Sequence, residues 1–294
     1  MLIFGIPIQL FSTQIMLGLI NGAFYALLSL GLAIIFGLLN IVNFAHGAFY
    51  MLGAFAALLL LEYLGINYWV ALAVVPLGIG LLGCVIERFI LRWIYDLDHL
   101  YGMILTFGMG LVIVGIFRNL YGATGLAYSM PAGLQGGYNL GFMYLPASRA
   151  FVIVASVLVC LATWIAIEKT RMGSWLRAAT EKPQLTEAFG INVPLLVTLT
   201  YGFGVALAAF AGVLAAPIFS VNPTMGSDLI IVVFAVVVIG GMGSISGAIL
   251  TGFMLGLVEG LTKVFWPQAS STVIFVIMAI VLLVRPAGLF GKQA

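Results

Sequence analysis

Three places in this apolar chain carry side chains that could do chemistry. The first is the run from Asn40 to Gly47, which brings Asn40, Asn43 and His46 close together in sequence. Amide and imidazole groups exchange hydrogen bonds readily, so these side chains could line the path of a polar solute. The alternative is a hydrogen-bonded cap on the helix that is expected to begin after Phe44.

The second place is Glu259, a carboxylate inside an apolar run. Charged groups in such runs are costly and usually face a cavity or a partner. Glu259 could therefore belong to a solute path, or it could make a structural hydrogen bond or lie at an interface near residues 263–269. Asp228 and Glu62 lie near the ends of apolar runs and are expected at an interface.

The third place is the glycine-rich run 240–247, where Gly241, Gly243 and Ser244 interrupt an apolar stretch. Paired breaks in the two halves of a membrane chain point to a transport path, although these two breaks share only faint sequence similarity. The candidate path residues are the polar and glycine residues of both breaks and the carboxylate: Asn40, Asn43, His46, Gly241, Gly243, Ser244 and Glu259.

The residues that metal binding, catalysis or ATP binding would require are missing from the sequence. No metal-ligand cluster, catalytic triad or haem-type histidine pair occurs in this chain, which has 2 histidines. The ending Gly288 to Lys292 is not a phosphate-binding loop, because Pro286 stands where that loop needs glycine and Gln293 where it needs serine or threonine. We therefore expect no enzyme and no cofactor, ATP or Mg²⁺ bound by this chain.

The composition is that of a chain that folds in lipid. Hydrophobic residues make up 64% and charged residues 7%, with a mean hydropathy of +1.25, whereas globular chains carry about 25% charge. A net charge of +2 leaves no basic surface for nucleic acid. The first basic residue is Arg88, so the N-terminal apolar stretch lacks the basic region of a cleaved signal peptide and is expected to remain.

Nine apolar runs approach the length of about 20 residues that a membrane-crossing helix needs. They are 13–39, 46–65, 68–90, 101–118, 150–167, 194–218, 228–243, 247–262 and 270–285. The stretch 228–262 would be about 50 Å long as one helix, too long for a core of about 30 Å, so it must break within 240–247. We expect an all-α polytopic membrane protein with eight or nine transmembrane helices, broken near 40–47 and 240–247, forming a single domain over 1–294. Whether 228–243 crosses or re-enters stays open.

Small residues recur along one expected helix, at Gly252, Gly256 and Gly260. Such a ladder lets two helices approach closely, and helix packing is its first interpretation. A gate that slides along this face is the alternative.

Basic residues indicate which loops face the cytoplasm. The segment 168–193 holds four of the 11 lysines and arginines, and Arg88, Arg92 and Arg285 flank other spans. The segment 119–148 has no charged residue and is expected to be the large external loop. The N-terminus is then expected outside and the C-terminus inside.

The segment 168–193 also contains the signals of a short helix. Pro183 suits a first helical turn, and Gly190 suits the left-handed position just past a helix end. Residues 183–189 are too few to cross a membrane, so a short helix is expected at the cytoplasmic face. From these residues alone, a coupling element and a solvated loop that only sets topology are equally supported.

This segment resembles the EAA-type coupling loop of bacterial ABC importer permeases and is most similar to that of branched-chain amino-acid permeases of the LivH type. The resemblance rests on Arg177-Ala178, Glu187-Ala188 and Gly190-Ile191-Asn192. Matching segments follow in order over nearly the whole chain: Asn21 to Leu27, Asn40 to Gly47, Gly240 to Ala248 and Arg285 to Lys292. One departure is Phe189, which stands where the motif has its second alanine.

The resemblance implies the transmembrane permease subunit of an ABC importer, a multi-pass protein of the bacterial cytoplasmic (inner) membrane. It implies a second homologous permease subunit in a heterodimer, two cytoplasmic ATP-binding subunits that hold ATP and Mg²⁺, and a periplasmic solute-binding protein. Within the cytoplasmic coupling loop 168–193, the residues implied in ATPase coupling are Arg177, Pro183, Glu187, Ala188, Gly190 and Ile191.

The implied mechanism is alternating access, in which closing ATPases push on the loop and rock the helix bundle. The implied substrates are branched-chain or related small, net-neutral amino acids, which suit an apolar path with few charges. Related permeases for urea, amides and aromatic acids leave the specificity open. The alternative is a stand-alone secondary carrier or channel for a small solute such as urea or an amide, with Glu259 as its main candidate for ion coupling.

Overall fold

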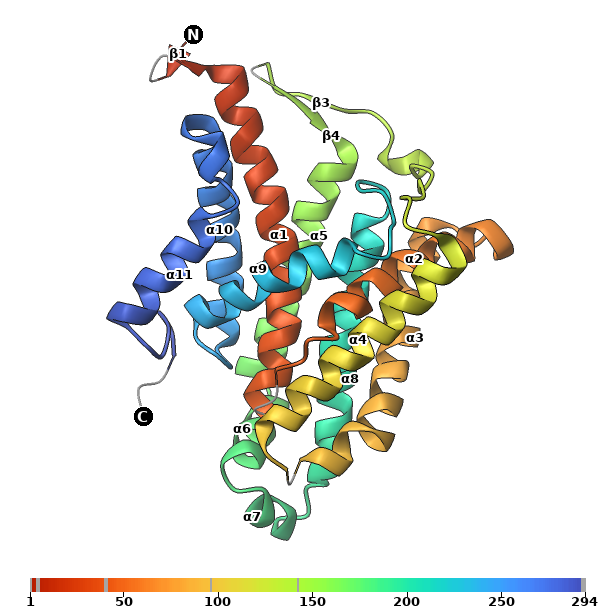
Figure 1. The fold of residues 1–294 in the computed structure, drawn as a ribbon, viewed down its shortest axis with the longest axis vertical. Helices are drawn as coiled ribbons and strands as arrows, with labels where there is room; N and C mark the ends of the chain where they lie inside the picture. The colour runs from red at the N-terminus through yellow and green to blue at the C-terminus, as the bar shows by residue number, and fades with distance from the viewer. Residues whose placement is uncertain (1, 4–5, 40–41, 96, 142, 292–294) are drawn as a thin grey trace.

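The computed structural model describes residues 2–3, 6–39, 42–95, 97–141 and 143–291, most of which are helical (Figure 1). Among these residues, seven helices are long and apolar enough to cross a membrane. They are α1 (Ile8–Leu39), α2 (His46–Leu64), α3 (Tyr68–Phe89), α4 (His99–Tyr121), α5 (Ala147–Glu168), α8 (Val193–Ala215) and α10 (Ile245–Phe265). The expected all-α polytopic membrane fold is confirmed.

Two further apolar helices are shorter. α9 (Met225–Gly240) has 16 residues and α11 (Val273–Val284) has 12. At about 1.5 Å per residue they are about 24 Å and about 18 Å long, which is less than a hydrocarbon core of about 30 Å. Each of the nine predicted spans corresponds to an apolar helix in the described part of the chain, and seven of these helices are long enough to cross.

The predicted break in 240–247 separates α9 from α10. α9 ends at Gly240 and α10 begins at Ile245. Between them, Gly241 has a φ of 99° and Gly243 a φ of 81°. Glycine adopts these left-handed angles without strain because it has no Cβ, and this explains why the helix stops here.

The predicted break in 40–47 separates α1 from α2. α1 ends at Leu39, and α2 begins at His46 after a turn in which the His46 amide donates to the Asn43 carbonyl at 3.2 Å. Asn40 and Ile41 lie outside the described residues, so the path role predicted for Asn40 stays a prediction.

α1 is the most buried of the seven long helices, and α10 packs along it. A Cβ added at Gly256 would lie 2.3 Å from the Gly22 Cα, and one at Gly252 would lie 2.6 Å from the Ala26 Cα. Real side chains do not fit at such distances, so the two backbones touch along the glycines. In lipid, such close packing replaces the hydrophobic effect as a source of helix association. The glycine ladder predicted on this helix is therefore a packing surface.

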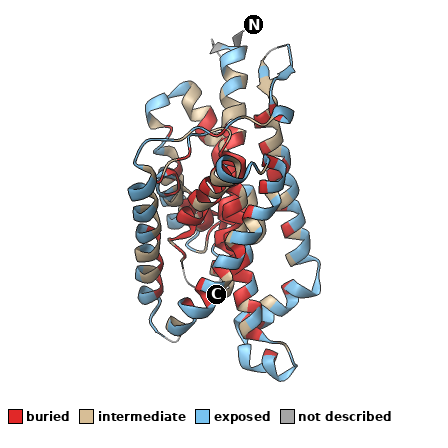
Figure 2. Cartoon of the chain, turned by 90° about the vertical axis from the view of Figure 1, so that its right-hand side faces the viewer, coloured by how far each residue is buried: buried red, intermediate tan, exposed pale blue. Residues whose placement is uncertain are grey.

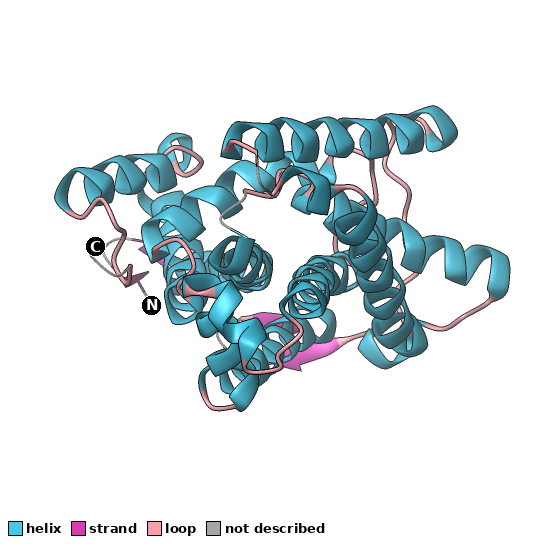
Figure 3. Cartoon of the chain, turned by 90° about the horizontal axis from the view of Figure 1, so that it is seen from below, coloured by secondary structure: helices cyan, strands magenta, loops and turns pink. Residues whose placement is uncertain are grey.

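α8 is buried between α2 and α3 by the same means. A Cβ at Gly53 of α2 would lie 2.2 Å from the Ala209 carbonyl oxygen, and one at Gly202 of α8 would lie 2.8 Å from the Gly80 carbonyl oxygen. The outer helices α3, α4 and α5 instead expose large apolar side chains. Examples are Leu77, Ile104 and Leu158. Exposed residues surround a buried interior (Figure 2). Seen end-on, the helices form one bundle (Figure 3).

The two ends of the bundle differ (Figure 1). One end, here called the α7 end, carries α6 (Arg171–Glu181) and α7 (Pro183–Ala188). The opposite end, here called the hairpin end, carries β3 (Gly137–Asn139) paired antiparallel with β4 (Tyr144–Pro146). The basic segment 168–193 and the uncharged segment 119–148 thus lie at opposite ends, as the orientation argument requires.

Short elements complete the described chain. β1 (Leu2–Ile3) pairs antiparallel with β2 (Ile6–Pro7) before α1 begins. Single 3₁₀ turns follow α3, divide the hairpin-end loop and connect α10 to α11: η1 (Leu91–Ile94), η2 (Ala132–Leu134) and η3 (Pro267–Ala269). An isolated antiparallel bridge joins Leu126 to Val221, which ties this loop to the segment before α9.

The short helix predicted over 183–189 is α7, which begins at Pro183. Gly190 follows its end with a φ of 84°, as predicted. α6 was not predicted, although a helical signal was present. The apolar residues of α6 recur at the i, i+3, i+4 and i+7 spacing of one helix face: Met172, Trp175, Leu176 and Ala179.

Candidate functional site

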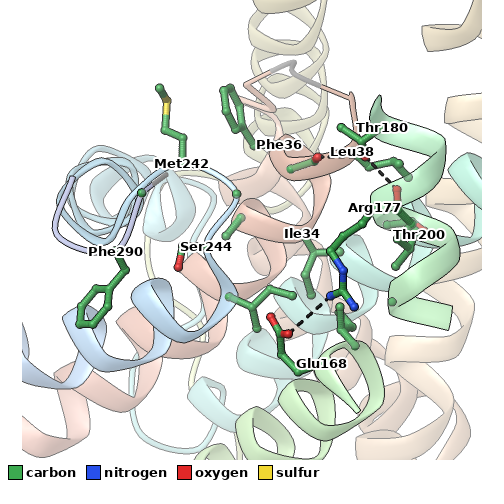
Figure 4. Close-up of a pocket in the computed structure, with 18 of the residues that line it drawn as sticks. Ile34, Phe36, Leu38, Glu168, Arg177, Thr180, Thr200, Met242, Ser244 and Phe290 are labelled. Carbon is green, nitrogen blue, oxygen red and sulfur yellow. Dashed lines mark hydrogen bonds and ion pairs between the residues drawn. The ribbon is translucent and has the colours of Figure 1, made fainter. Parts of the chain in front are cut away.

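A pocket of about 430 Å³ opens at the α7 end, where α1, the α5–α6 junction and the α9–α10 break meet (Figure 4). It brings together two features that the sequence placed apart, namely the basic segment through Arg177 and the glycine-rich break through Gly243 and Ser244. Much of its lining is apolar, including Ile34 and Phe36 of α1. This meeting point is the candidate site.

Polar contacts connect α6 to this pocket. Arg177 forms an ion pair with Glu168 at 3.5 Å, and these two side chains are 50% and 42% exposed. The Thr180 hydroxyl donates to the Leu176 carbonyl within α6 at 2.9 Å and also lies 3.4 Å from the Gly37 carbonyl at the end of α1. An exposed ion pair of this kind contributes about 0–1 kcal/mol to stability. It therefore holds α6 only weakly, and Arg177 can exchange partners.

The glycine-rich break forms the opposite wall of the pocket. A Cβ at Gly37 would lie 3.2 Å from the Gly243 Cα, so the end of α1 touches the break directly. Ser244 begins α10 by accepting a hydrogen bond from the Gly247 amide at 3.1 Å. Gly241 is not among the residues that line the pocket, and a Cβ there would lie 2.5 Å from the Gly291 amide nitrogen.

The C-terminal segment closes the end of α9. The Leu289 amide donates to the Ile239 carbonyl at 2.8 Å, and the Phe290 amide donates to the Gly240 carbonyl at 3.2 Å. Carbonyls at the end of a helix have no partner within the helix, so this segment satisfies two of them. Phe290 also lines the pocket.

The described polar residues of the α1–α2 break are buried in the protein, and neither pocket described here includes them. The Asn43 amide donates to the Tyr201 hydroxyl of α8 at 3.1 Å and accepts from the Ala45 amide at 3.1 Å. The His46 ring shares a hydrogen bond with the Leu28 carbonyl through Nε2 at 3.0 Å, so this nitrogen carries the proton. These contacts connect the turn to α1 and α8, but neither side chain caps α2, whose N-cap residue Ala45 has no side-chain cap hydrogen bond. The path role of both residues stays a prediction.

Glu259 is buried and joins α10 to α1. Its carboxylate accepts from the Tyr25 hydroxyl at 2.7 Å and from the Asn21 amide at 3.3 Å. It also pairs with Lys263, one helical turn along α10, at 2.5 Å. A buried carboxylate needs such donors because an unpaired charge is very costly to desolvate. Both Asn21 and Tyr25 also line a second pocket, so Glu259 lies directly behind the wall of that pocket.

The residues implied in coupling form a projection at the α7 end. Pro183, Glu187, Ala188 and Gly190 are all exposed. Ile191 is half-buried and packs on the small apolar cluster of Ala179, Val193 and Leu196. Phe189 is 85% exposed, although burial would be the normal state of so large an apolar side chain.

A family model for the permease component of branched-chain amino acid transport systems matches residues 14–283. The chain belongs to this permease family. The permease is 30% identical over 297 residues to the high-affinity branched-chain amino acid transport system permease protein LivH of Escherichia coli (strain K12), with 96% of each chain covered. It is 31% identical to the corresponding protein BraD of Pseudomonas aeruginosa, with 95% of each covered. It is also 28% identical to LivM of Escherichia coli (strain K12), covering 90% of this chain and 67% of LivM.

The sequence analysis of this permease missed a second buried carboxylate, at the α7 end. Glu87 of α3 is 1% exposed, and it accepts hydrogen bonds from the Tyr95 hydroxyl at 2.7 Å and from the Thr198 hydroxyl of α8. Burial and the Glu87 carboxylate together raise the pKa of Tyr95. One signal was available, since Gly80, Gly83 and Glu87 share the α3 face that packs on α8.

Proposed function

We propose that this permease is the membrane subunit of an ABC importer for branched-chain or related small, net-neutral amino acids. In this proposal it lies in the bacterial inner membrane and works by alternating access, and partner subunits bind the ATP and Mg²⁺ that it does not bind itself. The observation that carries the proposal is the exposed α7 projection, which is joined through α6 to the wall of a pocket that reaches the bundle.

The coupling step follows from this geometry. α7 has 6 residues and is followed by the exposed Phe189, which offers a large apolar contact to a partner at the α7 end. α6 follows α5 directly and touches the end of α1 through Thr180. A push on α7 therefore moves α6 against α1 and changes the shape of the pocket, with the bundle as the two-state element. Phe189 occupies the place of the motif's second alanine and supplies most of this apolar contact.

The relatives support the proposed partners. The permease is similar to both LivH and LivM, two permease proteins whose names assign them to high-affinity branched-chain amino acid transport. We infer a complex of this chain with a second, homologous permease, two ATPases at the α7 end and a solute-binding protein at the hairpin end. The apolar faces of the outer helices contact lipid.

The substrate class agrees with the pocket at the α7 end. Its wall is apolar except for a few groups, among which Arg177 provides a positive charge and Glu168 and Glu181 provide negative charges. A zwitterionic amino acid with an apolar side chain can pair with charges of both signs, whereas urea and simple amides cannot. The contacts of Glu259 favour an ABC importer over an ion-coupled carrier, because Lys263 and Tyr25 already neutralise and solvate its carboxylate.

The test is copurification of the transporter and reconstitution of uptake in liposomes. Phe189→Asp is compared with Tyr138→Asp, which changes an exposed aromatic residue of β3 at the hairpin end. We expect Phe189→Asp to lose the ATPase and to lower ATP-driven leucine uptake about tenfold or more, the effect of losing one interface hot spot. Tyr138→Asp keeps both. Leucine uptake by the purified chain without any ATPase would refute the proposal and establish a carrier.

A further inference from the structure

A second pocket, of about 310 Å³, lies nearer the hairpin end and is separate from the pocket at the α7 end. It lies between α1, α2, the first turns of α9 and the segment that precedes α9. Its lining combines aromatic rings with a few polar groups: Asn21, Phe24, Tyr25, Tyr50, Phe219, Ser220, Asn222, Met225, Asp228 and Leu229. Along α1, Asn21 precedes Gly37 of the first pocket by 16 residues, or about 24 Å.

The charge of this pocket is negative. Asp228 is exposed, and its carboxylate has no hydrogen bond or ion pair with any residue that the structure describes. The lining contains no lysine or arginine. Glu259 behind the wall is neutralised by Lys263 at 2.5 Å, so Asp228 alone sets the sign.

The aromatic wall of this pocket also favours a positively charged ligand. Phe24 and Phe219 pack with ring centroids 5.6 Å apart, and Tyr25 is held in place by its bond to Glu259. Ring faces attract cations and also accept apolar groups. The Ser220 hydroxyl makes no hydrogen bond with a described residue, so it is free to donate to a carboxylate. The pocket thus suits a primary ammonium with an apolar substituent.

We propose that this pocket is a binding station for the transported amino acid, with its ammonium group at Asp228 and its side chain against Phe24, Phe219 and Met225. The inference rests on the proposed function and adds a site to it. Between the two pockets, residues 26–32 of α1 are buried, so the station is closed toward the α7 end in this structure. A bound solute would wait there until the bundle moves.

Asp228 also has a structural alternative that the test must separate. It lies in the first turn of α9, where a carboxylate stabilises a helix through the positive end of the helix dipole. A structural role would make a variant less stable and would weaken all ligands alike. A binding role would weaken only ligands that carry an ammonium group.

The experiment uses the full transporter complex in nanodiscs, without the solute-binding protein. Binding of radiolabelled leucine is measured, with 3-methylbutylamine and 4-methylpentanoate as competitors that keep only the ammonium or only the carboxylate. Asp228→Asn is compared with the wild type and with Glu62→Gln, a change of an exposed carboxylate outside the pocket. Thermal unfolding of each variant is recorded in parallel.

We expect Asp228→Asn to raise the Kd of leucine and of the amine about tenfold, as loss of a charge-assisted hydrogen bond would. Competition by 4-methylpentanoate and the unfolding temperature stay unchanged, and Glu62→Gln behaves as the wild type. Three results would overturn the binding station. They are unchanged leucine binding by Asp228→Asn, failure of the amine to displace leucine from the wild type, and an equal loss of binding for both competitors. ATP-driven uptake by the wild type is measured separately, so a failure of the station is distinguished from a failure of the proposed function.

Discussion

At the scale of residues, the permease buries two carboxylates by surrounding them with donors from other elements. Glu259 has a cationic partner in Lys263, whereas the donors to Glu87 that the structure describes are the hydroxyls of Tyr95 and Thr198. A buried charge tolerates the loss of a donor poorly, because the remaining groups cannot replace the lost solvation. Each carboxylate therefore ties together helices that are distant in sequence.

Removing a donor to Glu87 tests this directly. Tyr95→Phe deletes the hydroxyl and keeps the ring, so we expect a loss of about 1–3 kcal/mol in stability. The measurement is thermal unfolding of the purified complex in detergent. Tyr63→Phe, at a tyrosine that is 74% exposed, serves as the matched control and leaves unfolding unchanged. Equal unfolding of the two variants would show that Glu87 does not depend on this bond.

The pair of Glu259 and Lys263 gives a second test. Lys263→Met leaves the carboxylate with only neutral donors, and we expect it to destabilise the permease by about 1–3 kcal/mol. Adding Glu259→Gln removes the unpaired charge and restores part of the loss. A double-mutant cycle measured by unfolding gives the coupling. Additive effects of the two changes would contradict the ion pair.

At the scale of elements, glycine decides where helices can touch. The α1–α10 contact leaves no room for a Cβ at Gly256, whereas Gly108 of α4 has no atom within 4 Å of an added Cβ. Glycine thus has different roles in the two helices. Gly256 permits a close helix contact, whereas Gly108 lies on an outer face with no described neighbour.

Substitution of these two glycines should therefore have opposite effects. We expect Gly256→Ala to push α1 and α10 apart and to destabilise the bundle by about 1–3 kcal/mol. Gly108→Ala should instead stabilise α4 by about 0.5–1 kcal/mol, because alanine favours the helix. Size-exclusion profiles and unfolding temperatures measure both. A Gly256→Ala protein as stable as the wild type would mean that the two helices are not in contact.

Local signals in the sequence predicted the elements well. Pro183 and Gly190 bounded α7, and the glycine-rich run stopped α9, because these residues act on the backbone within one turn. The contacts of the candidate residues were not predictable in the same way. The bond from Asn43 to Tyr201 joins positions 158 residues apart, and nothing local in the sequence specifies such a partner.

At the scale of the whole molecule, the two pockets lie along one helix with a closed segment between them. Residues 26–32 of α1 are buried, and the Ser29 hydroxyl donates to the Ala248 carbonyl of α10 at 3.2 Å. This arrangement is one that the alternating access proposed above requires, namely two pockets with a barrier between them.

Accessibility of introduced cysteines tests the barrier. In a background of Cys84→Ser and Cys160→Ser, we expect a water-soluble maleimide to label Asn222→Cys and Ser244→Cys, which lie in the two pockets. Ser29→Cys should react at least about 100-fold more slowly, because its opening requires a change of the bundle that costs a few kcal/mol. Mass spectrometry of the labelled protein measures the three rates. Fast labelling of Ser29→Cys would place water in the barrier.

The short α11 has a consequence for the surrounding lipid. Its 12 residues end in Leu283 and Val284, whose side chains are 86% and 75% exposed, so its length of about 18 Å meets the acyl chains directly. If α11 crosses the membrane, the bilayer beside it becomes thinner than its average of about 30 Å, at a cost that grows with each ångström of hydrophobic mismatch. The acyl-chain length of the host membrane would then set the cost of hydrophobic mismatch on the side of the permease that α11 forms. Short-chain lipids lower that cost, and thick, sterol-like bilayers increase it.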